Sequence, residues 1–407
     1  MDNIRKKTLL IIFVSMAFFS ILTLAAIFII NELNYNQPEI YDISSDTQGV
    51  SDQEILIGSS SALSGHAGFL GTNYMHGALS YLNEINKQGG IYGRKIRLIS
   101  YDDQYDPPQT IINTQKLINE DGVFALFNYV GTPTAIRIIP IVEEAKIPLL
   151  GILSGANVLR DPSNRYIFNI RSSYFQETEL AIDFFVDRLK LKKIAVFFQG
   201  DAYGSDGLEG TKIALIKRGM EPISFESYTR GTEDVEEAVE KIVSSGADAV
   251  VMIGTYGPSA KFVLLAKQKN PQLLFHSVSF VGAKEFINNL KGETSNVYIT
   301  QVVPPPESSD RFESVKKFNE TFLRYYPEEK PNSEAFEGFI NAKVLVEALR
   351  KCKEDLNRGN FIASLESLRG FSVGTDDNVT FGPNDRQGLE KTYLTSINDG
   401  NLFIVEN

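Results

Sequence analysis

The stretch of residues 55–107 decides the fold. It opens with ILIGSSSALSG at residues 55–65 and ends with GGIYGRKIRLISYDDQYDP at residues 89–107. Residues 55–57 and 96–101 are short apolar runs bounded by glycine, serine or aspartate, which is typical of buried strands. Between them, apolar side chains recur at helical spacing: Tyr74, Ala78, Tyr81, Leu82 and Ile85. The stretch therefore predicts a strand, a covered helix and a second, parallel strand, which is a βαβ unit.

The same alternation continues through most of the chain and predicts an α/β fold with two similar halves. We expect further strands at residues 123–128, 148–150, 166–170, 194–198, 223–228, 249–253, 273–276 and 297–300. We expect further helices at residues 107–120, 133–144, 176–189, 207–217, 235–242 and 258–267. After residue 302 the pattern becomes helical over residues 310–325, 334–352 and 361–368, and a hairpin at residues 392–397 and 401–405 follows.

Composition limits the class of protein. With 407 residues, 43% of them hydrophobic, the chain is long enough for substantial cores. The formal charge of -11 is spread along the sequence and would repel phosphate backbones, so nucleic acid is not an expected partner. Cys352 is the only cysteine, which excludes an intramolecular disulfide, and we interpret it as an apolar residue of a buried helix.

The N-terminus predicts a membrane-inserting segment. Arg5, Lys6 and Lys7 precede residues 8–30, which carry no charged side chain and are long enough to cross a bilayer as a helix. We favour an uncleaved anchor in residues 1–30 over a cleaved signal, because the apolar run continues past the best small-residue site. The basic residues favour a cytoplasmic N-terminus, so the rest of the chain is expected to be extracytoplasmic. Residues 31–53 are polar and aperiodic and predict a flexible tether.

Three short motifs resemble one family. They are SALSG at residues 61–65, NKQGGIYGR at residues 86–94, and YDD at residues 101–103 with Asp106 and Pro107 following. This combination resembles the first lobe of the solute-binding proteins of ABC importers that are of the Leu/Ile/Val-binding type. The resemblance implies the type I periplasmic binding protein fold, in which two Rossmann-like lobes with parallel central sheets are joined by a three-strand hinge.

The resemblance also implies the division into lobes. Residues 54–171 and 302–374 would form the first α/β lobe, and residues 172–301 and 375–407 the second. The chain would cross between lobes near Arg171, Gln301 and Gly374. Closure of the lobes around a ligand is the usual motion of such a hinge.

The loop after residues 123–128 is a candidate anion site. It contains Gly131, Thr132 and Thr134, and we interpret Thr132 as the N-cap of a helix whose first residue is Pro133. The glycine would give access to the amides and to the positive end of the helix, which suit a carboxylate. Simple capping without a ligand is the alternative that the residues alone leave open. In the resembling family the ligand carboxylate is held at this loop.

Other candidate residues follow the ends of other strands, where ligands of parallel sheets bind. Ser154 and Gly155 lie in a loop that the family also uses. In the second half, Tyr203 and Tyr256 stand where a strand gives way to a helix and match cleft residues of the family. Leu70 would shape the first-lobe wall, and the neighbouring Tyr74 fits either that wall or the core.

One position departs from the family. Relatives that bind α-amino acids have an acidic residue after a later strand, to hold the ammonium, where this chain has Ser279 followed by Phe280. A buried ammonium without a counter-charge is unfavourable, so neutral ligands and simple carboxylates gain weight, including aromatic acids. Asp201, Glu177 or Glu285 could supply the missing charge instead, which keeps an amino-acid ligand open.

Catalytic motifs are missing from the sequence. His66, His76 and His276 lie in unrelated segments, and no zinc-protease, nucleophile-elbow or phosphate-loop pattern occurs. Asp102 and Asp103 are adjacent on a strand end and would point in opposite directions, so we interpret them as loop-bonding and capping residues. We therefore expect no enzyme activity, no cofactor and no metal.

The sequence thus predicts an extracytoplasmic solute-binding component of an ABC importer. It would trap a small carboxylate-bearing ligand, an amino acid or an aromatic or other organic acid, and its partner would be a permease in the membrane. A sensor that signals closure to a membrane partner is the alternative. The predicted ligand-binding residues are Gly131, Thr132, Thr134, Ser154, Gly155, Tyr203, Tyr256, Ser279, Phe280 and Leu70.

Overall fold

The computed structural model describes residues 46–406. The predicted membrane segment, residues 1–30, lies outside these residues, as do residues 31–45 of the predicted tether and the terminal Asn407. Among residues 46–406, no helix combines the length and the apolar character that a membrane span requires.

Two parallel sheets organise the described chain. The first has the strand order β2-β1-β3-β4-β5, and every neighbouring pair in it is parallel. Its strands are β1 (Glu54–Ser61), β2 (Lys95–Asp102), β3 (Ala125–Phe127), β4 (Leu149–Leu150) and β5 (Ile167–Phe168). The strands predicted at residues 123–128 and 166–170 are thus shorter in the structure than the apolar runs from which they were predicted.

The second sheet repeats this order and adds a hairpin. Its order is β14-β13-β10-β9-β8-β6-β7, in which β13 pairs antiparallel with both β14 and β10, and the remaining pairs are parallel. Its strands are β6 (Ile194–Gln199), β7 (Ser224–Tyr228), β8 (Ala249–Ile253), β9 (Leu274–Ser277), β10 (Val297–Gln301), β13 (Tyr393–Asn398) and β14 (Asn401–Ile404). In each half the second strand lies outside the first, so both halves have the same doubly wound topology.

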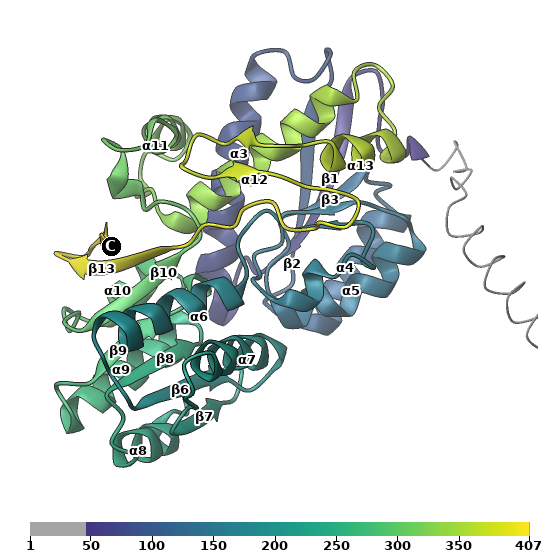
Figure 1. Cartoon of the computed structure of the whole chain (residues 1–407). Coiled ribbons are helices and arrows are strands. Elements are labelled where there is room, and N and C mark those ends of the chain that lie inside the picture. Colours follow the sequence, from purple (N-terminus) through teal and green to yellow (C-terminus); the bar gives the residue numbers. More distant parts are fainter. Residues whose placement is uncertain (1–45, 407) are drawn as a thin grey trace, which may run out of the picture. The chain divides into compact units, whose positions relative to one another are not determined.

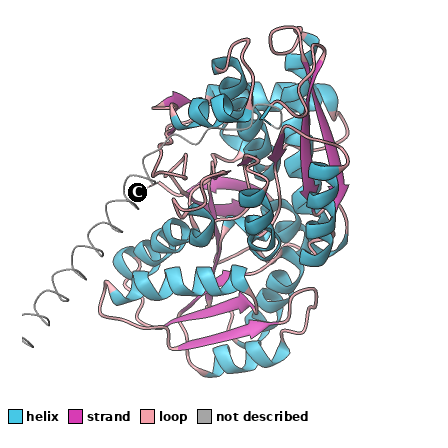
Figure 2. Cartoon of the chain, turned by 90° about the vertical axis from the view of Figure 1, so that its right-hand side faces the viewer, coloured by secondary structure: helices cyan, strands magenta, loops and turns pink. Residues whose placement is uncertain are grey.

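Helices cover the sheets (Figures 1 and 2). Around the first sheet are α3 (Gly68–Lys87), α4 (Pro107–Asn119), α5 (Thr132–Glu144), α11 (Glu313–Tyr325), α12 (Ser333–Lys351) and α13 (Arg358–Glu366). Around the second are α6 (Tyr174–Ile182), α7 (Ala202–Ile216), α8 (Glu236–Ser244), α9 (Tyr256–Lys269) and α10 (Ala283–Asn289). In Figure 1, α3 lies beside α12, and α4 lies beside α5. We call the part around the first sheet the first lobe and the part around the second sheet the second lobe.

Several helices differ from the sequence prediction, and two of these differences have a clear local cause. The helix predicted at residues 207–217 begins at Ala202, because the carboxylate of Asp201 accepts the amides of Tyr203 and Gly204 and caps it there. The short α10 was not predicted. It follows Gly282 in a left-handed conformation with φ 75°, and its 7 residues are too few to show a helical period.

The connections between the lobes lie side by side. Residues 386–389 run along residues 169–170, with the Asn169 amide donating to the Arg386 carbonyl at 2.9 Å and the Leu389 amide to the Ile170 carbonyl at 2.8 Å. Farther along, Tyr393 pairs with Gln301 in the second sheet. The last connection therefore lies between the first two, which gives the chain a three-stranded hinge region.

The exact lobe boundaries remain a prediction, but the packing near the last connection is clear. Val379, Phe381 and Leu389 are buried and belong to the core cluster around the first sheet. Val379 belongs to a two-stranded ladder, β11 (Phe371–Ser372) with β12 (Asn378–Val379). Residues 375–389 therefore pack on the first lobe, and the chain enters the second sheet only at β13.

A close contact between α3 and α12 gives the first prediction. A Cβ at Gly338 would lie 1.9 Å from the Tyr74 carbonyl oxygen, so the helices must separate to admit it. We expect Gly338→Ala to lower the free energy of unfolding by about 1–3 kcal/mol, measured by urea denaturation. Arg350→Ala, at an exposed site on the same helix, is the control and should change it by less than about 0.5 kcal/mol. Equal effects of both substitutions would contradict the steric reading.

Candidate functional site

The predicted ligand residues gather where the carboxyl ends of the two sheets face each other. Gly131 and Thr132 follow β3, Ser154 and Gly155 follow β4, Tyr203 follows β6, and Tyr256 follows β8. Ligands of such sheets bind beyond the strand ends, at the point where the strand order reverses. In each lobe that point lies between the first and third strands, β1 and β3 or β6 and β8.

The start of α5 is built differently from the prediction. Gly131, with φ 96°, is the N-cap, and Thr132 is the first helical residue, so the predicted threonine cap is wrong. The reason is the backbone conformation, which a glycine adopts without strain. The Thr134 hydroxyl donates to the carbonyls of Gly131, at 2.9 Å, and Val130. Because the first amides of a helix have no acceptor within it, this end of α5 presents N–H groups and the positive pole of the helix.

Hydroxyl groups from two loops meet beside this helix end. The Thr132 and Ser154 hydroxyl oxygens are 2.7 Å apart, and both residues are buried. Gly155 accepts the Tyr174 amide at 2.8 Å, and a Cβ at Gly155 would lie 2.5 Å from the Tyr174 ring. The structure therefore brings together the two first-lobe loops that the sequence predicted, and it places Tyr174 directly against them.

A cation that the sequence analysis missed lies behind these loops. Arg160 donates to the carbonyls of Ser154 and Ala156 at 3.2 and 2.9 Å, and to those of Arg171 and Ser172 at 2.9 and 3.1 Å. Its Nε donates to the side-chain amide oxygen of Gln387 at 2.7 Å. These acceptors are all neutral, so the guanidinium adds positive charge next to the Ser154 loop.

Aromatic rings from both lobes form a continuous chain across the seam. The ring of Tyr105, in the first lobe, lies 5.9 Å from that of Phe280 in the second. Phe280 lies 4.7 Å from Tyr203, and Tyr203 lies 5.2 Å from Tyr174. All four side chains are buried, and they belong to one apolar cluster that includes residues of both lobes. We call these four residues the aromatic chain. Tyr203 and Phe280 were predicted, whereas Tyr105 and Tyr174 were not.

Two other predicted residues lie farther along the seam. Leu70 is buried in the same apolar cluster, and a Cβ at Gly282 would lie 3.0 Å from its Cδ2 atom. Tyr256 is half-buried and contacts Phe69 edge-on, with ring centroids 6.2 Å apart. Tyr74 is part of the buried cluster and donates from its hydroxyl to the Gly151 carbonyl at 3.3 Å.

Ser279 has a carboxylate beside it, supplied by another element. Glu177 of α6 accepts the Ser279 amide at 2.7 Å and its hydroxyl at 2.9 Å. It also accepts the Thr300 hydroxyl at 2.7 Å and lies 3.4 Å from a guanidinium nitrogen of Arg171, which also bonds the Ser279 hydroxyl. Of the three acids named from the sequence as possible replacements, Glu177 therefore lies at the right place, but its oxygens are already engaged.

Arg171 links the two lobes electrostatically. On one side it pairs with Glu177, and on the other its Nε lies 3.6 Å from Glu337 of α12. The three side chains are at most 5% exposed. A third carboxylate, Glu334, accepts the amide of Ala283 across the seam at 2.9 Å. We call Arg171, Glu177, Glu334 and Glu337 the charge cluster, and it holds three carboxylates and one guanidinium.

Burial raises the pKa of both α12 carboxylates. The pKa values of Glu334 and Glu337 rise to about 7, mainly because burial disfavours the charged form, although Arg171 opposes the shift. Each also has a buried oxygen without a hydrogen-bond partner, Oε2 of Glu334 and Oε1 of Glu337. The charge cluster therefore takes up protons readily when the seam is closed.

The other acids suggested from the sequence are engaged elsewhere. Asp201 caps α7 and accepts the Gln199 side-chain amide at 2.7 Å, while Glu285 accepts the Asn288 side chain at 3.2 Å. No group of three or more His, Cys, Asp or Glu among residues 46–406 is arranged to hold a metal ion.

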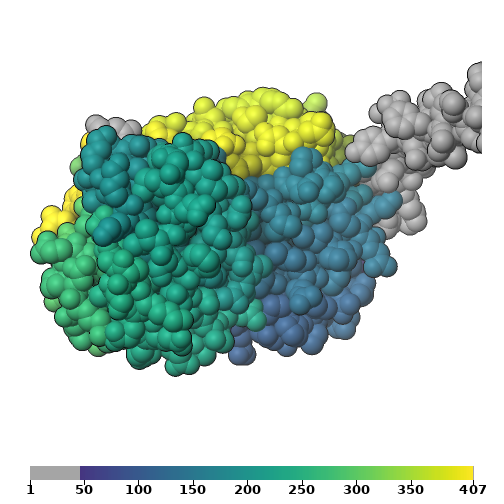
Figure 3. Space-filling view, turned by 60° about the horizontal axis from the view of Figure 1, so that its bottom comes forward, coloured from purple at the N-terminus to yellow at the C-terminus, as the bar shows by residue number. Residues whose placement is uncertain are grey.

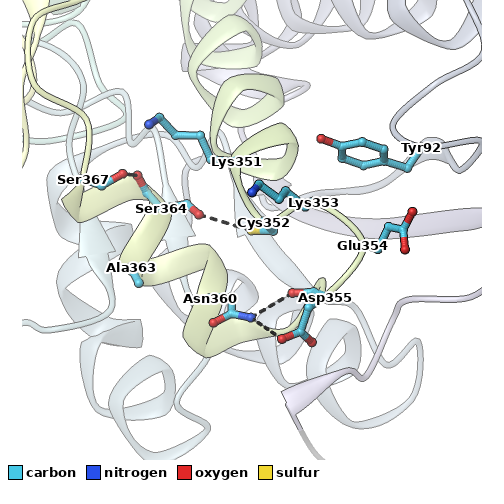
Figure 4. A pocket seen from close by; sticks show the side chains of 10 residues that line it. All are labelled: Tyr92, Lys351, Cys352, Lys353, Glu354, Asp355, Asn360, Ala363, Ser364 and Ser367. Atoms are coloured by element: carbon cyan, nitrogen blue, oxygen red, sulfur yellow. Dashed lines mark hydrogen bonds between the residues drawn. The ribbon is translucent and has the colours of Figure 1, made fainter.

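A hollow of ≈ 1010 Å³ lies elsewhere, on the first lobe between the end of α12, α13 and Tyr92 (Figure 4). Cys352 borders it and, as predicted, is buried on a helix end, where its thiol donates to the Ala348 carbonyl at 3.3 Å.

In the space-filling view the two lobes meet along a seam, with C-terminal residues in yellow lying along both (Figure 3).

Comparison with known proteins identifies the family. Residues 54–401 match the model of a family described as periplasmic binding protein, and the chain belongs to this family. The family and the fold predicted from the sequence are therefore confirmed. Members of this family are solute-binding proteins and not enzymes.

Individual relatives agree with this assignment. A relative from Pseudomonas aeruginosa, named amino acid binding protein, is 27% identical over 239 residues, which cover 59% of this chain and 64% of that protein. The match thus spans less than two thirds of that relative. The crystal structure of a possible leucine/isoleucine/valine-binding protein from Rhodopirellula baltica has 32% identity and a TM-score of 0.83, covering 89% of this chain and 98% of that one. A branched-chain amino acid transporter protein from Thermus thermophilus with bound valine, at 17% identity and TM-score 0.78, shows the same fold.

The charge cluster predicts the effect of removing its cation. In Arg171→Met, Glu177 and Glu337 would stay buried without their counter-charge, so we expect the free energy of unfolding to fall by about 3–5 kcal/mol. Arg97→Met removes an exposed pair with Glu54 and should change it by less than about 0.5 kcal/mol. Urea denaturation of the full chain measures both. A loss in Arg171→Met no larger than in the control would show that the cluster does not stabilise the fold.

The raised pKa of Glu337 predicts a pH dependence. The folded pKa of about 7 exceeds the ordinary 4.5, so the folded state binds the proton more tightly. The contribution of protonated Glu337 to the free energy of unfolding is fully present below the ordinary pKa. It is lost as pH rises through the pKa of the folded state. Between about pH 5 and about pH 8, Glu337→Gln should therefore gain stability relative to wild type, by up to about 1.4 kcal/mol per pH unit. Urea denaturation at several pH values measures the difference, with Glu347→Gln, half-exposed on the same helix, as the matched control. A constant difference would refute the prediction.

Proposed function

We propose that this protein is the extracytoplasmic solute-binding component of an ABC importer, and that it traps a small carboxylate-bearing ligand between its two lobes. The observation that carries the proposal is the buried N-terminal end of α5. Helix amides lie there next to the hydroxyls of Thr132 and Ser154, which are in contact with each other. Helix N-termini stabilise anions without needing a charged side chain.

Two further features favour an anion at this end of the seam. Arg160 adds a positive charge behind the Ser154 loop, and the oxygens that accept its hydrogen bonds there are neutral. The aromatic chain excludes water from the same region, which strengthens every electrostatic interaction within it. The Tyr174 amide donates to the Gly155 carbonyl, and the Tyr174 ring lies against Gly155 beside the Ser154 loop.

Two ligand classes fit this arrangement, and they differ in one charge. Names of relatives refer to amino acids, and an amino acid needs a partner for its ammonium. Glu177 stands beside Ser279 but is engaged by Arg171, Ser279 and Thr300, which favours organic acids without an ammonium group. Both classes carry the carboxylate on which the proposal rests.

Membership of the family supports an extracytoplasmic location and a permease partner. A periplasmic binding protein works outside the cytoplasmic membrane and delivers its solute to a permease within it. The predicted N-terminal anchor, residues 1–30, would keep this chain near such a permease. Importer function predicts that vesicles containing the permease take up the solute only when this protein is present.

Identification of the bound compound tests the proposal directly. We expect mass spectrometry of small molecules released from the denatured, purified full-length chain to detect a compound with a carboxyl group. The same measurement separates an amino acid from an organic acid by its nitrogen content. Release of a compound without a carboxyl group, which then binds again to the refolded chain, would overturn the proposal.

The substitution Thr132→Val tests how much the Thr132 hydroxyl contributes to ligand affinity. Valine keeps the shape of the side chain but cannot donate to a carboxylate, and hydrogen bonds to charged groups contribute about 1.5–3 kcal/mol. We expect titration calorimetry to show affinity for the released compound reduced by about tenfold or more. Thr211→Val is the matched control, because Thr211 is equally buried but bonds within α7, donating to the Gly207 carbonyl at 2.8 Å. Equal affinities of both variants would remove Thr132 from the site.

A further inference from the structure

Tyr105 is held in the seam by a rigid loop. It follows β2 and has a left-handed backbone, with φ 62°, as has Gln104 before it, with φ 53°. Side chains other than glycine rarely adopt this conformation, so other contacts must stabilise it. Asp103 provides them, because its carboxylate accepts the Tyr105 amide at 3.0 Å and the hydroxyls of Ser60 and Thr110 at 2.8 and 3.0 Å.

The ring of Tyr105 lies directly over the predicted carboxylate loop. A Cβ at Gly131 would be 2.0 Å from the ring atom Cε2, so the ring fills the space that any side chain at Gly131 would need. The ring is 1% exposed. Tyr105 therefore forms the wall that faces the start of α5, and the glycine at position 131 is what allows the ring to lie so close.

The same ring also touches the second lobe. It contacts Phe280 at 5.9 Å, and its hydroxyl accepts the Gln199 side-chain amide at 3.4 Å. The Arg230 guanidinium lies 5.6 Å from the ring centroid. Tyr105 is thus fixed by its own loop on one side and by the closed second lobe on the other, which leaves it little room to move in the closed form.

We propose that Tyr105 is the specificity-determining residue of the cleft, and that it limits the ligand to carboxylates with a small substituent by filling the space over Gly131. This inference rests on the proposed function, because the carboxylate would bind at the helix end that the ring covers. The substituent of the ligand must share the space over Gly131 with the ring. A shorter side chain at position 105 gives that space to the ligand.

Titration calorimetry with a series of carboxylates of increasing size tests the inference on the full-length chain. The probes are acetate, 3-methylbutanoate and phenylacetate, with alanine, leucine and phenylalanine as the matching amino acids. We expect Tyr105→Ala to shift the affinity ratio of the largest to the smallest member by about tenfold or more toward the largest. Tyr105→Phe keeps the ring and loses only the bond to Gln199, so it should keep the wild-type size order.

Two further variants keep the test decisive. Tyr92→Ala is the matched control, because Tyr92 also has a left-handed backbone, with φ 49°, but lies exposed outside the seam. Tyr105→Leu, which shortens the side chain while keeping it apolar, is measured in parallel in case the alanine variant unfolds. If wild type binds members of the series and the Tyr105→Ala and Tyr105→Leu variants keep its size order, the inference alone fails. If neither wild type nor these variants bind any member, the proposed carboxylate site fails, and the inference with it.

Discussion

The closed arrangement of the lobes depends on one buried cation that carboxylates of both lobes share. Arg171 lies at the first connection between the lobes, and it pairs with Glu177 of α6 and with Glu337 of α12. In a region closed to water, separating these charges is costly unless water replaces the lost contacts. Opening the seam lets water do so, whereas closing it requires all the partners to be in position. The guanidinium therefore couples the hinge to the packing of both lobes.

The aromatic chain also connects the two lobes, through contacts between buried rings. Tyr105, Phe280, Tyr203 and Tyr174 carry ring contacts from the first lobe through the second and back to Gly155 of the first. Such pairs contribute about 0.5–1.5 kcal/mol each beyond their buried area. They also exclude water from the end of α5, which strengthens its attraction for an anion. The same rings thus favour closure and prepare the site.

Local sequence was sufficient for the fold and for half of the site. The strands of both parallel sheets and most helices are predictable from periodicity, whereas the short β11 and β12 are not, and Gly131, Ser154, Tyr203 and Tyr256 follow strand ends in a parallel sheet. Contacts between distant segments were not accessible in this way. Most of the second lobe lies between Arg171 and Glu337 in the sequence. No local pattern around either residue indicates that the two form an ion pair. Tyr105 lies within the motif that resembles the family. Its contact with Gly131 depends on its left-handed backbone conformation, which the sequence does not reveal.

The two charged ends of the seam suggest how a ligand would be oriented. Positive charge gathers behind the first-lobe loops, from Arg160 and the start of α5, whereas the charge cluster holds more carboxylates than cations. A ligand carboxylate would therefore be attracted to Thr132 and Ser154, and the ionised forms of Glu334 and Glu337 would repel it. Between these ends lies the apolar cluster that contains the aromatic chain. In the proposed complex the remainder of the ligand would lie along Tyr105 and Phe280, so the ring that covers Gly131 would limit its size.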